Sequence, residues 1–346
     1  MENGTRRDQL YPLSIVYLVF LTPSVIGSFS VLVVSIVKWR HLTTQVHLLV
    51  QLALADLLAA VILMFTSAMN IDKTDIGGDF CQYSLPLSLT FYFISFLLVV
   101  VYAWKSKSSI KGWRARPAED EGGQSQCQRN IVAIPVYAIV WLFPIAMYFV
   151  YVLTRLTITS MTTITDRSLH LVTGNESKSS CILFLHGGRD SHSSAGRVNE
   201  FISYCLFLGV ILVLLSCSVI YFTVGKWYKQ HETVGIFPVE GDGRSRRRMK
   251  RVVSTARNMV IVILFCWAPA LVLMFTLMIH VDQEYLLSLY FIQAASVSLQ
   301  GFLNSMVYAW RRPNFTEAVL GENTPLLRHK HRAFFEESLI HHSPPS

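Results

Sequence analysis

Seven apolar stretches alternate with polar, charged segments along the chain. Each stretch is at least as long as the helix of about 20 residues that crosses a bilayer. Because backbone groups in hydrocarbon must be hydrogen-bonded within their own segment, each stretch is predicted to be a helix. The pattern therefore predicts an all-α integral membrane protein, a seven-transmembrane helix bundle whose spans cover residues 13–37, 46–69, 80–104, 131–153, 201–224, 259–280 and 285–310.

The composition supports a membrane protein. Hydrophobic residues make up 52% of the chain and charged residues only 15%, and the mean hydropathy is +0.42. These values are too apolar for a soluble enzyme, a disordered chain or a disulfide-framework module. We expect no nucleic-acid partner, because the net charge of +8 has another explanation. Asp56 is the single charged residue that falls within a predicted span.

Lysine and arginine residues divide unequally between the two sides of the predicted bundle. The side that holds the C-terminus carries 22 of the 30, and the side that holds the N-terminus carries 8. Such an excess marks the cytoplasmic side. We therefore expect an extracellular N-terminus at residues 1–12, the bundle at 13–312 and a cytoplasmic tail at 313–346, in the plasma membrane or an endolysosomal membrane.

A basic run at residues 244–251 lies just before the sixth predicted span. Anionic lipids of the inner leaflet attract such a run by about 1 kcal/mol per charge. Membrane lipids are therefore candidate partners of this segment. The favoured interpretation is that the run serves only as a topology signal.

Three sequence triplets fit the acceptor pattern for N-glycosylation, which requires a lumenal location. The topology predicts that Asn3 and Asn175 lie outside and are modified. It also predicts that Asn314 lies on the cytoplasmic side and stays bare. Glycosylation is therefore a direct test of the predicted orientation.

The six cysteines divide by compartment. Cys81, at the outer end of the third span, and Cys181, in the long second outside loop, are the two expected in the oxidising lumen. We expect them to form a disulfide, with two free thiols as the alternative. Of the others, Cys127 is expected in the cytosol, and three lie in spans, where a small apolar packing role is the default: Cys205, Cys217 and Cys266.

Three short motifs lie at matching depths in the predicted bundle. The second span contains the run LALADLL at residues 52–58, the sixth FCWAP at 265–269, and the seventh ends in NSMVY at 304–308. Together with the cysteine pair they resemble the rhodopsin-like superfamily of G-protein-coupled receptors over about 300 of the 346 residues. Within it the chain resembles a divergent orphan member, similar to the receptor-like group called transmembrane protein 116. The resemblance implies an unknown extracellular ligand and a cytoplasmic heterotrimeric G protein.

An ionisable residue inside a span is costly and usually faces polar partners in the bundle interior. Candidate partners of Asp56 at matching depth are Ser28, Ser95, Asn304 and Ser305. The resemblance implies that this polar core binds a sodium ion. The alternative is a protonated Asp56 held by hydrogen bonds without an ion. No other metal or cofactor is expected.

Candidate switch residues follow from the same resemblance. Pro269 lacks a backbone donor and is expected to kink the sixth helix. The resemblance implies that the packing of Trp267 changes on ligand binding, and that Tyr221 and Tyr308 meet in the active state. The alternatives are an aromatic residue packed beside a kink and two tyrosines that anchor the helices at the membrane interface.

The chain departs from the superfamily at several positions. Residues 105–107 read Lys-Ser-Lys where the superfamily has an acidic-Arg-aromatic triplet, so coupling to a G protein stays open. Ser305 replaces a proline of the seventh span. Ser88 stands where amine receptors have an aspartate, and a biogenic amine is therefore not the expected ligand.

The predicted tail contains an acidic dileucine pattern, formed by Glu322, Leu326 and Leu327. This spacing resembles sorting signals that clathrin adaptors bind. A chance match is the alternative for so short a motif.

A receptor that transduces a signal is the leading interpretation of the whole sequence. One alternative is a small-solute transporter or channel, which usually needs paired ionisable groups at the midplane. The other is a scaffold that has lost signalling. We expect no enzymatic activity and identify no catalytic residue, because the spans contain neither a second carboxylate nor a His-Glu-x-x-His motif.

Overall fold

A computed structural model describes the backbone of residues 2–37, 44–71, 77–114, 124–166, 243–279 and 286–311, and of isolated residues between 208 and 226. Side chains are described over a smaller part of these ranges: 11–37, 47–71, 80, 83–105, 136–157, 254–277, 279 and 286–307, together with the isolated residues. The chain divides into two units, Met1–Tyr308 and Ala309–Ser346.

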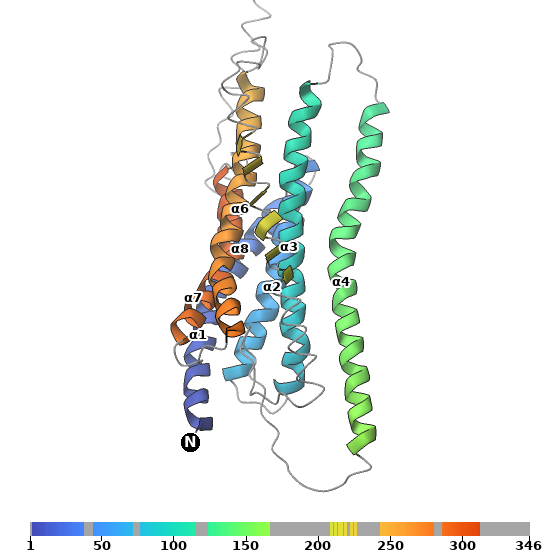
Figure 1. Cartoon of the computed structure of the whole chain (residues 1–346). Helices are drawn as coiled ribbons and strands as arrows, with labels where there is room; N and C mark the ends of the chain where they lie inside the picture. The colour runs from blue at the N-terminus through green and yellow to red at the C-terminus, as the bar shows by residue number, and fades with distance from the viewer. Residues whose placement is uncertain are drawn as a thin grey trace, which may run out of the picture. The chain divides into compact units, whose positions relative to one another are not determined.

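Every regular element in the described ranges is a helix (Figure 1). Five helices contain stretches long and apolar enough to cross a membrane, which are Tyr11–Val37, His47–Ile71, Tyr83–Lys105, Val136–Thr157 and Ser254–Leu277. They correspond to the first four predicted spans and the sixth. The all-helical character is thus confirmed for this part of the chain, whereas the count of seven and the orientation stay predictions. The helices are α1 (Glu2–Val37), α2 (Thr44–Ile71), α3 (Gly77–Arg114), α4 (Gln124–Asp166), α6 (Gly243–Met278), α7 (Leu287–Ser298) and α8 (Gln300–Arg311).

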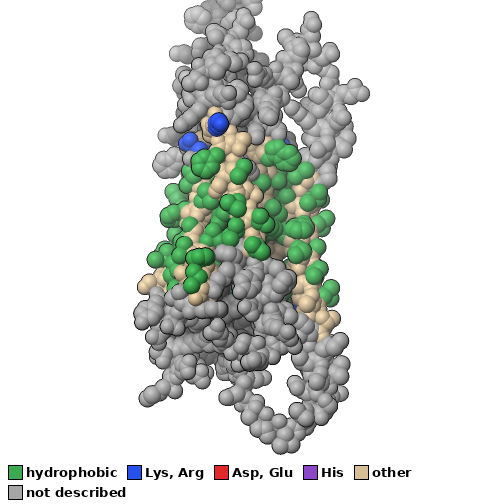
Figure 2. Space-filling view, in the orientation of Figure 1, with side chains coloured by type: hydrophobic (Ala, Val, Ile, Leu, Met, Phe, Trp, Pro, Cys, Tyr) green, Lys and Arg blue, Asp and Glu red, His purple; other side chains and the backbone are tan. Residues whose placement is uncertain are grey.

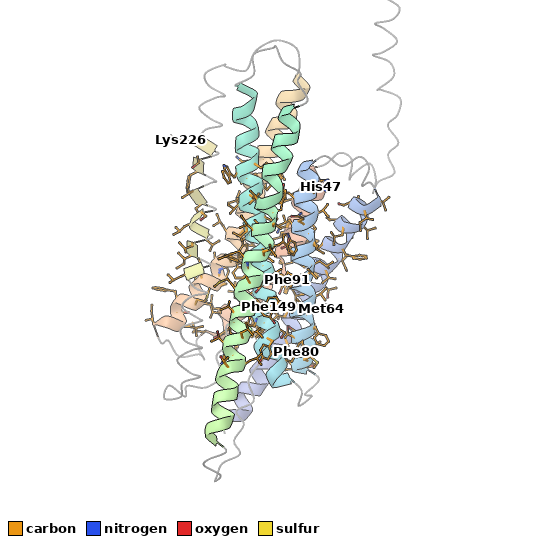
Figure 3. All side chains as sticks on the ribbon, turned by 90° about the vertical axis from the view of Figure 1, so that its right-hand side faces the viewer. His47, Met64, Phe80, Phe91, Phe149 and Lys226 are labelled. Carbon is orange, nitrogen blue, oxygen red and sulfur yellow. The ribbon has the colours of Figure 1, made fainter. Side chains whose placement is uncertain are left out.

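Within the first unit the helices pack in pairs. The central helices α2 and α3 contact each other, α2 also contacts α1, and α3 contacts α4 and α6. Helix α7 returns to α1 and α6. Figure 3 places His47 and Lys226 toward one end of the unit and Phe80 toward the other, as expected for helices that run back and forth. The core is formed by buried side chains of α1, α2, α3, α6 and α7.

The outer surface of these helices is apolar. On the face shown in Figure 2, hydrophobic side chains cover the described middle of the unit and Lys and Arg appear at its margin. Helix α4 is the most exposed example, since Leu142, Phe143 and Leu153 are each more than half exposed. A soluble protein would bury or cover so large an apolar surface, whereas hydrocarbon solvates it.

The last predicted span differs from the expectation of one helix over residues 285–310. It consists of two short helices, α7 and α8, on either side of Leu299. Leu299 has φ −77° and ψ −9° and connects them without a proline or glycine at the joint. A second difference is that α6 begins at Gly243, so that the basic run 244–251 is helical rather than part of a loop.

Candidate functional site

The candidate site is built around Asp56, which lies in the middle of α2 and is only 1% exposed. Its position follows from the spacing of its neighbours. Leu52, Ala59 and Leu63 recur at helical intervals and are buried on the same side of α2. Because Asp56 lies on this buried apolar face of α2, its carboxylate is placed in the interior of the bundle.

Three neutral donors satisfy the carboxylate. Ser95 Oγ on α3 donates to Oδ1 at 2.7 Å, and Asn304 Nδ2 on α8 donates to Oδ2 at 2.8 Å. Gln300 Nε2, also on α8, donates to Oδ1 at 3.1 Å. The structure thus brings Ser95 and Asn304 to Asp56, and it adds Gln300, which the sequence analysis missed.

Gln300 connects two parts of the site. Its Oε1 accepts a hydrogen bond from Trp267 Nε1 on α6 at 2.6 Å. Its Nε2 donates to Asp56 and also approaches Ser95 Oγ at 3.2 Å. A continuous chain of hydrogen bonds therefore runs from the indole of Trp267 through the Gln300 amide to the Asp56 carboxylate. It links three elements that are far apart in sequence.

Trp267 is held by ring contacts as well. Its ring lies edge-on to Tyr92, with centroids 5.6 Å apart, and to Phe96, with centroids 4.9 Å apart. Both partners belong to α3, and Trp267 is only 1% exposed. Pro269 lies within α6, as predicted, where its ring deprives the carbonyl of Phe265 of a helical partner. Trp267, the candidate switch residue, thus packs against α3 and bonds to α8, and it lies two residues before the proline of its own helix.

Ser28 and Ser305 are buried near the site but do not bond to Asp56. Ser28 Oγ has no hydrogen-bond partner among the described residues, and Ser305 Oγ donates to the carbonyl of Gly301 at 2.7 Å. A Cβ placed on Gly301 would lie 3.0 Å from Ser28 Oγ and 3.4 Å from Asp56 Cβ. The lack of a side chain at Gly301 therefore lets α1, α2 and α8 meet at this depth.

The oxygen atoms of the site fit a hard monovalent cation. Asp56 supplies a negative charge, and within the described part of the chain two nearby oxygens are buried without a partner, Ser28 Oγ and Asn304 Oδ1. Hard cations take carboxylate, hydroxyl and amide oxygens as ligands. Over the part of the chain that the structure describes, no group of three or more His, Cys, Asp or Glu residues could hold a metal ion. The donor set therefore consists of the oxygen ligands that hard cations, sodium among them, prefer.

Two of the departures from the superfamily have defined contacts. Lys105 Nζ donates to Tyr137 OH at 3.1 Å and lies 5.6 Å from the centroid of the same ring, so that it joins α3 to α4. Ser88 Oγ donates to the carbonyl of Ala59 at 3.0 Å and is fully buried. Its hydroxyl is thus used in a contact between α3 and α2.

Several predicted sites lie outside the described residues or their described side chains. The backbones of Cys81, Asn3 and Tyr308 belong to α3, α1 and α8, but their side chains are not described. The disulfide, the glycosylation sites, the tyrosine pair and the sorting signal therefore stay predictions. The remaining residues of these sites lie outside the described ranges: Cys181, Asn175, Tyr221, Glu322, Leu326 and Leu327.

Comparison with protein families supplies an assignment for the whole chain. Residues 12–336 match the family described as Transmembrane protein 116. The match covers the described membrane-length helices from residue 12 onward and continues to residue 336. With its membrane-length helices and apolar outer surface, the chain is an integral, multi-pass helical membrane protein, and it belongs to the transmembrane protein 116 family.

Proposed function

We propose that this protein is a receptor-like seven-helix membrane protein that passes the binding of an extracellular ligand to its cytoplasmic face. The observation that carries the proposal is the hydrogen-bond chain from Trp267 through Gln300 to Asp56. The resemblance of three motifs to the rhodopsin-like superfamily supports it. In a receptor, the ligand site and the cytoplasmic face must both be able to shift the conformational equilibrium of one connecting element. This buried chain of polar groups has the connections for that role.

The series of hydrogen bonds can transmit a movement because each bond in it depends on the position of the next group. Rotation of the Trp267 ring would break its 2.6 Å bond to Gln300 Oε1. The freed amide would then reorient, and Asp56 would lose one of its three donors. Unpaired polar groups are expensive in a buried site, so the helices that carry them would shift to restore the bonds. A change at α6 would in this way reach α2 and α8.

We further propose that a sodium ion binds in this cluster, held by the Asp56 carboxylate, Ser28 Oγ and Asn304 Oδ1. The ion would supply the positive charge that balances the carboxylate. A ligand that binds only the folded protein stabilises it by RT ln(1 + [L]/Kd), which is about 1.4 kcal/mol at ten times Kd. Thermal stability of the purified chain should therefore be higher in Na⁺ than in K⁺ or choline at equal ionic strength. Asp56→Asn should abolish the sodium-specific part. A wild-type melting curve indifferent to the cation would favour a protonated Asp56 instead.

One observation favours a second candidate, a membrane scaffold without G-protein signalling. Lys105 belongs to the Lys-Ser-Lys triplet that replaces the superfamily's acidic-Arg-aromatic triplet. It is engaged with Tyr137 of α4 by a hydrogen bond and a cation–π contact. Lys105 thus connects α3, toward its predicted cytoplasmic end, to α4, and it stands at a position that in the superfamily belongs to the triplet that engages the G protein.

A recruitment assay separates the two candidates. The full chain would be expressed with a panel of engineered G proteins, and basal recruitment to the membrane would be measured. The receptor proposal expects recruitment of at least one G protein, with a level that changes in Asp56→Asn. Ser30→Ala is the matched control, since Ser30 is exposed and bonds only to the carbonyl of Ile26 in its own helix. Absence of recruitment across the panel, at normal surface expression, would favour the scaffold.

A further inference from the structure

The hydroxyl of Ser24, on α1, is bonded to two backbone groups of the last span. It donates to the carbonyl of Ser298 at 2.6 Å and accepts the N–H of Phe302 at 2.9 Å. In a regular α-helix the N–H of residue 302 donates directly to the carbonyl of residue 298. The Ser24 hydroxyl therefore stands between two groups that would otherwise pair with each other.

This insertion coincides with the break in the last span. Ser298 is the final residue of α7, Leu299 is the joint, and Phe302 lies in the first turn of α8. On either side the regular pattern persists, with Leu299 N–H bonded to Ala295 at 3.2 Å and Leu303 N–H bonded to Leu299 at 2.9 Å. A side chain that enters the backbone ladder is a known cause of helix kinks. No proline lies within α7 or α8, and the Ser24 hydroxyl occupies the place of the direct bond between Phe302 N–H and the Ser298 carbonyl.

Gly301 makes the insertion sterically possible. A Cβ at this position would lie 3.1 Å from Ser24 Oγ, closer than an ordinary van der Waals contact. Ser24 itself is 1% exposed, so its hydroxyl is shielded from competing water. The small residue on α8 and the hydroxyl on α1 thus form one fitted contact, which the sequence pattern of either helix alone does not reveal.

We propose that Ser24 is a positioning residue for the Asp56 site, and that its hydroxyl holds the joint at Leu299 open. The first turn of α8 begins at Gln300, and Asn304 follows one turn later on the same side. Both side chains reach Asp56 from this side of α8, and Gln300 also reaches Trp267. Without the hydroxyl, the Phe302 N–H and the Ser298 carbonyl pair directly, α7 and α8 join into one helix, and Gln300 turns away from Trp267.

The test is a spectroscopic signal at a residue to which Ser24 has no bond. The full chain, labelled with ¹⁵N-tryptophan in detergent micelles, contains seven tryptophans, and the indole N–H signal of Trp267 is assigned by its loss in Trp267→Phe. Ser24→Ala removes one oxygen atom and adds no bulk, so the variant is expected to fold. We expect the Trp267 indole signal to shift by more than its linewidth in Ser24→Ala, because the 2.6 Å bond to Gln300 is altered.

Two further variants make the result specific. Ser30→Ala, which removes an exposed hydroxyl from the same helix, should leave the Trp267 signal in place. Ser24→Thr keeps the hydroxyl and should leave the signal close to its wild-type position. The inference is overturned if Ser24→Ala leaves the Trp267 signal unmoved, whether or not the melting temperature falls. It is also overturned if Ser24→Thr moves the signal as far as Ser24→Ala does, since the hydroxyl would then not be the cause.

Discussion

Replacing Gln300 by Leu should lower the free energy of unfolding by more than the same replacement of a buried amide that makes a single hydrogen bond. The change removes the acceptor of the Trp267 indole N–H and one of three donors to Asp56. A buried donor left without a partner costs about 1–3 kcal/mol, and a hydrogen bond to a charged group contributes about 1.5–3 kcal/mol. We therefore expect Gln300→Leu to lower the free energy of unfolding by about 2.5–6 kcal/mol.

Gln293→Leu provides a matched control in α7. Gln293 is also fully buried, but its side chain accepts one hydrogen bond, from Tyr17 OH at 3.1 Å, and its Nε2 has no partner in the ranges that the structure describes. Its replacement leaves a single hydroxyl without an acceptor, which costs about 1–3 kcal/mol. Both variants exchange the same amide for the same apolar side chain, so the difference between them reports the extra bonds of Gln300.

The assay is thermal unfolding of the purified protein in one detergent and at one scan rate. Its readout is the fraction of the protein that stays monodisperse at each temperature. We expect the melting temperatures to fall in the order wild type, Gln293→Leu, Gln300→Leu. A Gln300→Leu protein that melts with the wild type, or no lower than Gln293→Leu, would refute the hydrogen-bond chain as an energetically important feature.

Three other predictions concern different parts of the chain. Gly301→Ala should lower the melting temperature, with an overpacking cost of about 1–3 kcal/mol, because the new methyl would lie 3.0 Å from Ser28 Oγ. Gly209→Ala, whose methyl meets no described atom within 4 Å, should not lower it, and equal effects would contradict the close contact. Cys81→Ala and Cys181→Ala should each reduce surface expression, and two free thiols in non-reducing peptide mapping of mature protein would exclude the disulfide. Removal of N-glycans should shift the band of the wild type but not of an Asn3→Gln/Asn175→Gln double variant, whereas a shift lost only in Asn314→Gln would invert the topology.

The sequence was sufficient to find Asp56, because a carboxylate within an apolar stretch of bilayer length has few structural solutions. Ser95 and Asn304 could be named as partners from their depth in the predicted spans. Gln300 was missed, although its spacing of four residues from Asn304 places both on one side of a helix. Within a stretch recognised by its hydropathy, an amide is a weaker signal than a charge.

Two features required the three-dimensional structure. The depth of Ser305 in the seventh span makes it a candidate partner of Asp56, but adjacent helical residues point about 100° apart, and its hydroxyl bonds to the carbonyl of Gly301 in its own helix. The break at Leu299 is caused by Ser24, more than 270 residues away along the chain. A contact between residues so far apart in the sequence produces no repeating pattern in either helix from which it could be predicted.

The measurement that most directly tests the account is a double-mutant cycle between Trp267→Phe and Asp56→Asn, read by thermal unfolding. The hydrogen bonds of the two residues meet at Gln300. If they are connected through it, their effects on stability should be non-additive, with a coupling of about 0.5–3 kcal/mol. The coupling should vanish when the cycle is repeated in Gln300→Leu. Additive effects in the wild-type background, or a coupling that persists without Gln300, would contradict the connection on which the proposed function depends.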